Sequence, residues 1–336
     1  MSRELHHYTL GSGTSRRAFL GTSLCLSALV PGFAAGADRW PSRPIVLSLL
    51  GPAGGGPDAV ARELAERIGM ALGQPIVIEN GAGGSGIVGM DQARRASPDG
   101  HRFVFTHIGA MVMNPALFKT LPYDPVRDFE PVSLVLTSPM ILVASPSLGV
   151  ESLEQLMDLA RRKPGTLMYG SAGVGTPMHI FTEQFKAAKQ VSMDHVPFKG
   201  STGLVQALLG AHILIGMEAA TAIMPVIATG KGRPLAVTGD VRMNILPEVP
   251  TFAELGIPNI GMSWLAVMAP KGTLPEAVQR LNREIERVLA IPELRRAWVA
   301  RGSIPGGGFP EVLAERIRTE LPRWREVIER AGIRPE

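Results

Sequence analysis

The sequence is poor in cysteine, in aromatic residues and in long apolar runs. Its 336 residues contain one cysteine, Cys25, and only 5% aromatic residues, and the formal net charge is +4. Because Cys25 lies inside the leader described next, the mature chain would have no cysteine, which excludes disulfides, thiol catalysis and cysteine metal sites. A nucleic-acid partner would require a dense basic face with aromatic platforms. The composition offers neither, so no nucleic-acid partner is predicted.

The first 37 residues differ from the rest of the chain. The basic pair Arg16-Arg17 precedes an apolar run that ends near Val30, and Ala35-Gly36-Ala37 provides an A-x-A site. This is the layout of a cleaved export signal, and its Ser-Arg-Arg-Ala-Phe-Leu core resembles the twin-arginine type. A membrane anchor is disfavoured, because the apolar run is shorter than ~20 residues. We therefore expect cleavage near Ala37 and a periplasmic location.

After the leader, short apolar runs of β type alternate with segments of helical period. Val60, Leu64 and Ile68, for example, recur every four residues and mark one buried helix face. Repeated strand-then-helix units predict an α/β fold with mostly parallel sheets flanked by helices. Strands are predicted over Ile45–Leu50, Ile76–Glu79, Phe103–Thr106, Ile141–Ala144, Leu167–Gly170, Ile213–Met217, Leu235–Thr238 and Leu265–Ala269, and helices over Pro57–Leu72, Val278–Leu289 and Leu313–Ile328.

The strands are too many for one compact sheet, so two lobes are predicted. The chain would cross into the second lobe near Val135–Ile141 and return near Pro258–Trp264. Lobe one would then comprise residues 38–138 and 262–336, and lobe two residues 139–261. A ligand cleft would lie between them.

Three glycine-rich turns each follow a predicted strand and open a helix. They are Gly51–Asp58, Gly81–Gly89 and Gly170–Thr176. A helix start has unpaired N–H groups and a positive dipole end, which suit an anion. None of the three turns contains lysine or arginine, so we predict a backbone cradle for a singly charged carboxylate. For any one turn, the alternative is that glycine merely allows a tight bend.

A nucleotide site is the main alternative. Gly54–Ala59 fits a loose G-x-G-x-x-G/A pattern, and Glu79 follows about 20 residues later, which would allow an exported NAD(P)-dependent oxidoreductase. Against this, Asp58 would occupy the first helical turn, where a pyrophosphate should lie. The sequence also has no Walker lysine, no H-E-x-x-H spacing and no G-x-S-x-G elbow. We therefore expect no enzymatic activity, no cofactor and no metal.

Short motifs follow one another in order along residues 40–336. They are Gly54-Gly-Gly-Pro-Asp58, Glu79-Asn80, Gly83-Gly-Ser-Gly-Ile-Val-Gly89, Ser97-Pro-Asp-Gly100, Leu121-Pro-Tyr-Asp-Pro-Val-Arg-Asp-Phe129, Tyr169-Gly-Ser-Ala-Gly-Val-Gly-Thr-Pro177, His195-Val-Pro-Phe-Lys-Gly-Ser201 and Leu246-Pro-Glu-Val-Pro-Thr-Phe252. Their order and spacing resemble the Bug family, periplasmic receptors similar to the solute-binding subunit of tripartite tricarboxylate transporters. The resemblance implies a monomeric, two-lobe periplasmic binding protein of type II-like architecture. Such a protein closes on a small carboxylate and passes it to the membrane subunits of a transporter, or reports its capture to a membrane sensor kinase.

The resemblance also implies where the ligand binds. The loops Gly51–Asp58 and Ser171–Thr176 would hold the carboxylate through main-chain N–H groups, hydroxyls and waters, with Ser171 and Thr176 as hydroxyl donors. Thr176 before Pro177 also suits a helix N-cap. The candidate ligand-binding residues are Pro52, Ala53, Gly55, Gly56, Asp58, His107, Ser171, Ala172, Gly173, Gly175, Thr176, Ser201, Thr202 and Glu218.

Two positions depart from the family pattern. Many members have a basic residue after Glu79-Asn80, where this chain has Gly81, so one salt partner is lost near the cleft mouth. Where the family often has Asp facing the far end of the ligand, this chain has Glu218, which favours a smaller ligand or one with an amine or hydroxyl there. The structural alternative for Glu218 is an exposed acid stabilised by a helix dipole. For His107, the alternatives are ligand contact and structural hydrogen bonding.

Overall fold

The computed structural model describes residues 40–81, 85–257 and 260–334. The predicted export signal, with Arg16-Arg17 and Cys25, lies outside these residues, as does the middle of the Gly81–Gly89 turn. Within the described ranges, every helix is too short or too polar to span a membrane.

The first sheet has six strands in the order β11-β4-β10-β3-β1-β2. Strand β1 is parallel to both of its neighbours, β2 and β3. Strand β10 is antiparallel to β3 and β4, and β11 is antiparallel to β4. The strands are β1 (Ile45–Leu49), β2 (Ile76–Asn80), β3 (Arg102–His107), β4 (Phe129–Ser138), β10 (Ser263–Pro270) and β11 (Ile304–Pro305).

The second sheet has five strands in the order β7-β6-β8-β5-β9. Strands β7, β6 and β8 are parallel, and β5 is antiparallel to both of its neighbours. The strands are β5 (Met140–Ala144), β6 (Met168–Ser171), β7 (Asp194–Pro197), β8 (Ile215–Ala219) and β9 (Arg233–Val237).

The predicted two-sheet α/β fold is confirmed, but the sheets are mixed and not mostly parallel. Parallel neighbours need a crossover connection within one sheet. Strands β4, β5 and β10 connect the two sheets, so they need no crossover within one sheet. All three run antiparallel to their neighbours.

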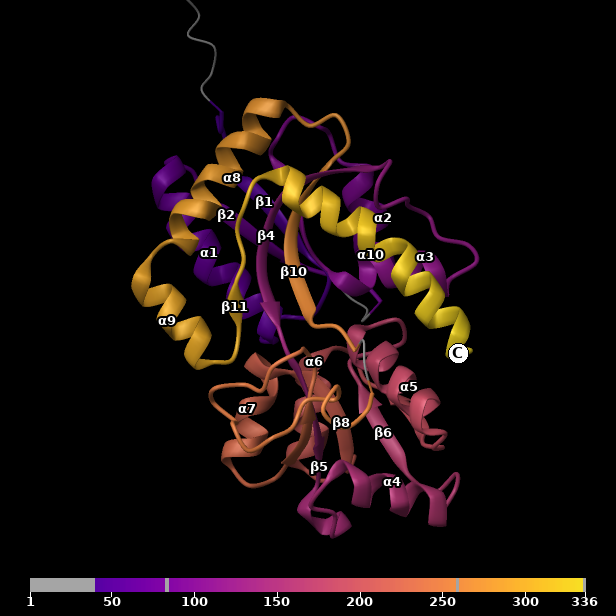
Figure 1. Ribbon diagram of the computed structural model, residues 1–336. Coiled ribbons are helices and arrows are strands. Elements are labelled where there is room, and N and C mark those ends of the chain that lie inside the picture. Colours follow the sequence, from indigo (N-terminus) through magenta and orange to yellow (C-terminus); the bar gives the residue numbers. More distant parts are fainter. Residues whose placement is uncertain (1–39, 82–84, 258–259, 335–336) are drawn as a thin grey trace, which may run out of the picture. The chain divides into compact units, whose positions relative to one another are not determined.

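The helices cover both faces of both sheets (Figure 1). One core lies under α1, α8 and α9 on the first sheet, and another lies under α6 and α7 on the second. The largest core extends from the first sheet, under α2, α3 and α10, to the second sheet, under α4 and α5. The helices are α1 (Gly56–Leu72), α2 (Ile87–Arg94), η1 (Gly109–Met113), α3 (Asn114–Leu117), η2 (Pro146–Leu148), α4 (Leu153–Arg162), α5 (Pro177–Lys189), α6 (Ser201–Leu209), α7 (Ala220–Ala228), α8 (Pro275–Leu289), α9 (Pro292–Ala300) and α10 (Pro310–Arg330).

Two strand connections link the sheets. Strand β4 continues through Pro139 directly into β5, and β10 brings the chain back to the first sheet. Ser138 at the end of β4 pairs with Ser263 at the start of β10, so the two connections lie side by side. A third link is made by α10, whose Trp324 stacks on Phe181 of α5 with ring centroids 5.4 Å apart.

Candidate functional site

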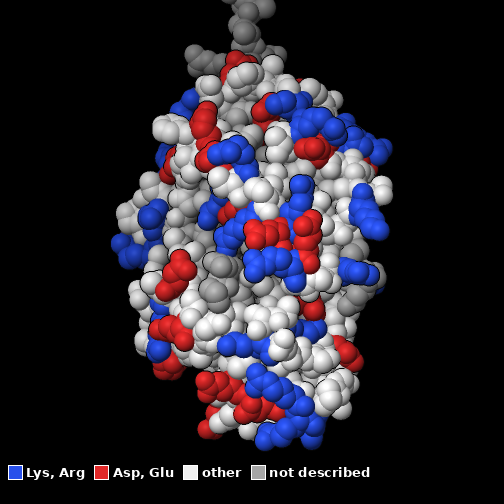
Figure 2. All heavy atoms as spheres, turned by 45° about the vertical axis from the view of Figure 1, so that its right-hand side comes forward, with Lys and Arg blue, Asp and Glu red and all other residues white. Residues whose placement is uncertain are grey.

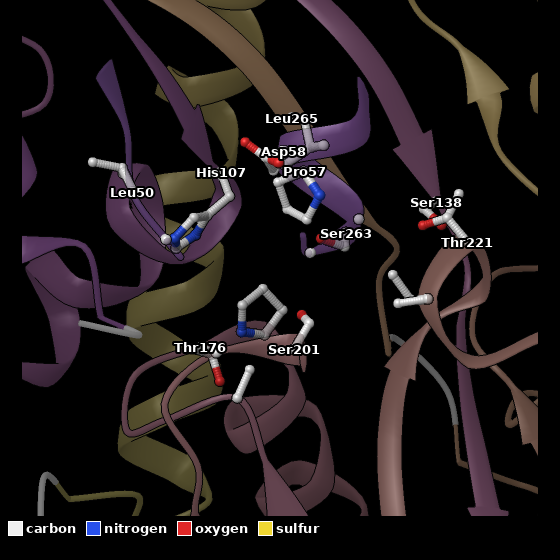
Figure 3. A pocket seen from close by; sticks show the side chains of 18 of the residues that line it. Leu50, Pro57, Asp58, His107, Ser138, Thr176, Ser201, Thr221, Ser263 and Leu265 are labelled. Atoms are coloured by element: carbon white, nitrogen blue, oxygen red, sulfur yellow. The ribbon is translucent and has the colours of Figure 1, made fainter. Parts of the chain in front are cut away.

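A cavity lies where the two sheets meet, and both sheets contribute to its lining (Figure 3). It encloses about 950 Å³ of empty space, part of which is open to solvent. A concave, mostly apolar space of this kind suits a small organic molecule. Pro57 and His107 lie on one side of the space, and Thr176 and Ser201 lie on the other.

Four helices begin at this cavity. The N-cap residues of α1, α5, α6 and α7 are Gly55, Thr176, Gly200 and Ala219, and all four line it. None of these helix starts has a side-chain cap. Their first N–H groups and positive dipole ends are therefore directed to one region, an arrangement that favours a bound anion.

Among the residues that the structure describes, no lysine or arginine lines this cavity. On the face shown in Figure 2, by contrast, Lys, Arg, Asp and Glu are interspersed over the surface. Most of the lining is apolar, with Leu50, Phe105, Leu136, Met178 and Leu265 among its larger side chains. An anion here would be met by backbone dipoles beside a carbon-rich wall.

Nine of the predicted ligand-binding residues line the cavity, and five do not. Those that line it are Pro52, Gly55, Gly56, Asp58, His107, Ala172, Thr176, Ser201 and Glu218. Those outside the lining are Ala53, Ser171, Gly173, Gly175 and Thr202. The starts of α1 and α5 correspond to two of the predicted glycine turns.

The third predicted glycine turn does not contribute to the cavity lining in its described part. Gly81 donates its N–H to the Leu49 carbonyl, 2.8 Å away. Gly86, the N-cap of α2, has positive φ, and a side chain there would collide with Leu50. This end of the turn packs behind the cavity wall.

Ser171 is fully buried and bonded within its own lobe. Its Oγ lies 2.6 Å from Nε2 of His195, donates to the Gly173 carbonyl and accepts from the Gly173 N–H. His195 in turn stacks between Tyr169 and His179. The hydroxyl that the sequence suggested for the ligand is thus used to hold the loop before α5.

Thr176 occupies the N-cap position of α5 but does not cap it with its side chain. Its hydroxyl donates to the Gly173 carbonyl at 2.6 Å. Because Pro177 has no N–H, the first free amides of α5 are those of Met178 and His179. The predicted N-cap position of Thr176 is therefore confirmed, but its hydroxyl is used within the loop, and the helix start stays open toward the cavity.

Asp58 supports the first loop. Its Oδ2 accepts from the Gly54 N–H at 3.0 Å and from Arg62 Nε at 2.9 Å, and its Oδ1 accepts from Asn80 Nδ2 at 2.9 Å. Burial opposes ionisation of Asp58, but these hydrogen bonds outweigh it and lower the pKa of the carboxyl below its ordinary value. Asp58 thus holds the turn in which a dinucleotide pyrophosphate would have to bind. Arg62 is paired with Asp58 and lies outside the cavity lining.

His107 is a neutral donor at the cavity wall. Burial lowers its pKa to about 4, so the ring is uncharged at pH 7. Its Nδ1 accepts from the Ala110 N–H at 3.3 Å, which places the proton on Nε2. The ring can therefore offer one N–H without adding charge.

Glu218 is 1% exposed, so the alternative of an exposed acid at a helix start is wrong. Oε1 accepts from the Ala219 N–H at 2.7 Å, and Oε2 has no hydrogen-bond partner among the described residues. Burial raises its pKa to about 7, although the Ala219 N–H and the Ser201 hydroxyl act in the opposite direction.

Sequence reasoning missed several lining residues. Gly200 opens α6 with φ 86°, and Thr221 and Ala222 lie in the first turn of α7. Ser138 and Ser263 line the cavity at the strand connections. The available signal for α7 was the Ile213–Met217 strand followed at once by a helical pattern, but no glycine turn marks that junction.

Comparison with known proteins points to one family. The family described as tripartite tricarboxylate transporter family receptor, TctC, matches residues 60–333. Protein BugT of Bordetella pertussis is 34% identical over 298 residues, covering 88% of this chain and 91% of BugT. The solved structure of R. palustris Rpa4515 with adipate has a TM-score of 0.85 and 34% identity, covering 88% of this chain and 100% of that chain. MatC (Rpa3494) from Rhodopseudomonas palustris with bound malate has a TM-score of 0.82 and 28% identity, covering 86% and 99%.

Proposed function

This chain belongs to the TctC family of tripartite tricarboxylate transporter receptors, and on that premise we propose that it captures a small organic carboxylate and delivers it to a membrane transporter. The observation that carries the proposal is the set of four uncapped helix starts around one cavity, whose described lining residues include no lysine or arginine. A bound carboxylate would supply the negative charge that the first turns of α5, α6 and α7 lack.

The magnitudes indicate what else the ligand must have. A helix start contributes about 0.3–1 kcal/mol to an anion beside it, so four contribute at most about 4 kcal/mol. Micromolar binding needs about 8 kcal/mol. The remainder has to come from direct hydrogen bonds and from burial of a carbon chain against Leu50, Phe105, Leu136 and Leu265. A carboxylate with an aliphatic body fits, and the adipate and malate of the two solved relatives are of this kind.

Capture would involve closure of two lobes about the strand connections. We take lobe one as residues 38–138 and 262–336, and lobe two as residues 139–261, because the two sheets divide at these boundaries. Across the cavity, Pro52 of the α1 loop packs against Gly200 at the start of α6. The ligand would stabilise the closed arrangement by contacting helix starts from both lobes.

The proposal includes export to the periplasm through the leader at residues 1–37, in keeping with the periplasmic binding proteins of this family. Delivery to the membrane subunits of a tripartite tricarboxylate-type transporter is the role that the family description supports.

Isothermal titration of the purified mature chain tests the proposal. Adipate and malate should bind and raise the melting temperature, whereas their uncharged diamides should not. NAD(P) serves as the probe for an oxidoreductase. A folded chain that binds NAD(P) and no member of a mono-, di- and tricarboxylate panel would contradict the receptor role.

A further inference from the structure

The cavity contains a buried acid with no counter-charge. Glu218 lies at the end of β8, on the same face of the strand as Gly216, which packs against Leu204 and Leu208 of α6. Its Oε1 is bonded to the Ala219 N–H, and its Oε2 is unpartnered among the described residues. A buried polar atom left without a partner is costly in a native structure unless something else satisfies it.

No cation from the elements packed against β8 compensates this acid. Helices α6 and α7 and strand β5 contain no ionisable side chain, and β6 contributes only Tyr169. The charged groups of α5 are Glu183, Lys186 and Lys189, of which Lys186 pairs with Glu183 and Lys189 bonds the Leu255 carbonyl.

The remaining ionisable groups near Glu218 are uncharged or paired. On α5, burial lowers the pKa of His179 to about 3, so that ring is neutral. Across the cavity, Asp58 is paired with Arg62, and burial lowers the pKa of His107 to about 4, so it is neutral as well. No charged neighbour is among the causes of the raised pKa of Glu218.

We propose that a dicarboxylate enters this cavity together with one proton, which is held between the distal carboxylate of the ligand and Oε2 of Glu218. The proton either is already on Glu218 or comes from solvent, so the uptake per ligand depends on pH, and no other covalent bond changes. The other carboxylate of the ligand is bound by the helix starts, so this inference rests on the proposed function.

Charge repulsion is the physical reason for the proton. Two ionised carboxylates at hydrogen-bond distance in a poorly solvated site repel strongly, and one of them takes up a proton, as in paired-carboxyl sites generally. Burial already raises the pKa of Glu218 to about 7, so in the free protein this acid keeps its proton to a higher pH than an exposed glutamate does. A ligand ammonium on ionised Glu218 is the opposite possibility, but it would face four positive helix ends.

The proposal predicts the sign of the pH dependence. Above pH 7 the free protein has lost the proton that the complex needs, so affinity for a dicarboxylate falls, by up to tenfold per pH unit. If the complex stays protonated throughout, binding takes up close to one proton at pH 8.5 and a smaller fraction at pH 6.5.

Titration calorimetry with adipate tests this. The wild-type chain is measured at pH 6.5, 7.5 and 8.5 in phosphate and in Tris, whose different ionisation enthalpies report proton uptake. Uptake approaching one proton at pH 8.5, with weaker binding, is the expected result. Adipic monoamide is the matched control ligand: its distal amide can donate to ionised Glu218, so it should bind without proton uptake.

Glu218→Gln provides the second arm, because the amide has the shape of the protonated acid and donates without titrating. We expect this variant to bind adipate with an affinity that does not change between pH 6.5 and 8.5 and with no proton uptake. Adipate binding to the wild type without proton uptake, binding that tightens as pH rises, or loss of adipate binding in a folded Glu218→Gln variant would each overturn the inference. Absence of binding by every carboxylate would instead contradict the proposed function itself.

Discussion

The helix starts at the cavity differ from those elsewhere in the molecule. Helices α4, α8, α9 and α10 each have a glutamate in the first turn. Helices α5, α6 and α7, which begin at the cavity, have no acidic residue there. An acidic side chain near a helix start is favourable by about 0.3–1 kcal/mol. The four helices away from the cavity thus have an acidic residue that stabilises their starts. The starts of α5, α6 and α7 have none, and there a bound anion could take its place.

Two helices refine the comparison. Helix α1 begins at the cavity with Asp58 in its first turn, but that carboxylate is bonded to Gly54, Arg62 and Asn80. Helix α2 lacks an acid in its first turn and does not line the cavity in its described part. The absence of an acid alone therefore does not identify a site; the convergence of several such starts does.

The largest effect should come from giving a cavity helix the acid it lacks. Ala222 lines the cavity in the first turn of α7. In Ala222→Asp, a fixed carboxylate would compete for the α7 amides and repel an anionic ligand, and we expect at least a hundredfold loss of adipate affinity, about 3 kcal/mol. Ala222→Asn, of nearly the same size and uncharged, should stay within about fivefold of the wild type. Equal losses in both variants, measured by calorimetry, would point to sterics and not to charge.

Replacing Glu218 by Gln should stabilise the folded protein, whereas replacing a first-turn glutamate of α4, α8, α9 or α10 should destabilise it. The folded pKa of Glu218, about 7, is above the ordinary 4.5, so below pH 4.5 this acid has no effect on stability. Between pH 4.5 and 7 the unfolded chain ionises first, and the folded state is progressively destabilised. Glu218→Gln should therefore raise the free energy of unfolding by about 3 kcal/mol at pH 8 and by less than about 0.5 kcal/mol at pH 4.5. Urea denaturation at the two pH values provides the measurement, and a loss of stability at pH 8 would show that the burial penalty is offset elsewhere.

Closure across the cavity can be tested at Gly200. Its φ is 86°, and a Cβ there would lie 2.8 Å from the Pro52 ring of the other lobe. Gly200→Ala should weaken adipate binding about tenfold, because the collision occurs where the two lobes meet. Gly149→Ala is the matched control, since Gly149 also has positive φ but has no atom within 4 Å of the added Cβ. Both variants should lose stability; a drop in affinity in both would mean that backbone strain, not closure, is responsible.

The smallest effect is expected at the outer helices. Glu276 lies in the first turn of α8, away from the cavity. Glu276→Gln should cost about 0.5 kcal/mol of unfolding free energy at low ionic strength and less in high salt. Adipate affinity should not change. A change in affinity as large as that of Ala222→Asp would remove the distinction between the two sets of helix starts.

Short apolar runs predicted eight of the described strands, but β4, β7 and β11 were missed. Pro131 lies inside β4, and proline within an apolar run disfavours a strand. The structure accommodates it with a register shift between Val267 and Met268 of the neighbouring β10. The resemblance to the Bug family, drawn from short motifs, is confirmed by the TctC match and by the similarity to BugT.

The candidate site was only partly predictable from sequence. The glycine turns indicated the starts of α1 and α5, because glycine marks a tight turn after a strand. The start of α6 also has a glycine with positive φ, Gly200, but the strand before it, β7, was not predicted, and the start of α7 has no glycine. The meeting of all four starts depends on how the two sheets pack. The contacts of Ser171 were not predictable for a related reason: its hydroxyl lies beside a helix start in the sequence, but its bonds to Gly173 and His195 form only in the folded lobe.

The most direct test of the account follows backbone amide signals by NMR while adipate is added to the mature chain. We expect the largest amide proton shifts at Met178, Thr202 and Ala222, in the first turns of α5, α6 and α7, and little change at the starts of α4, α8, α9 and α10. Saturable shifts confined to the outer helices or to lysine and arginine side chains, with the cavity amides unmoved, would contradict it.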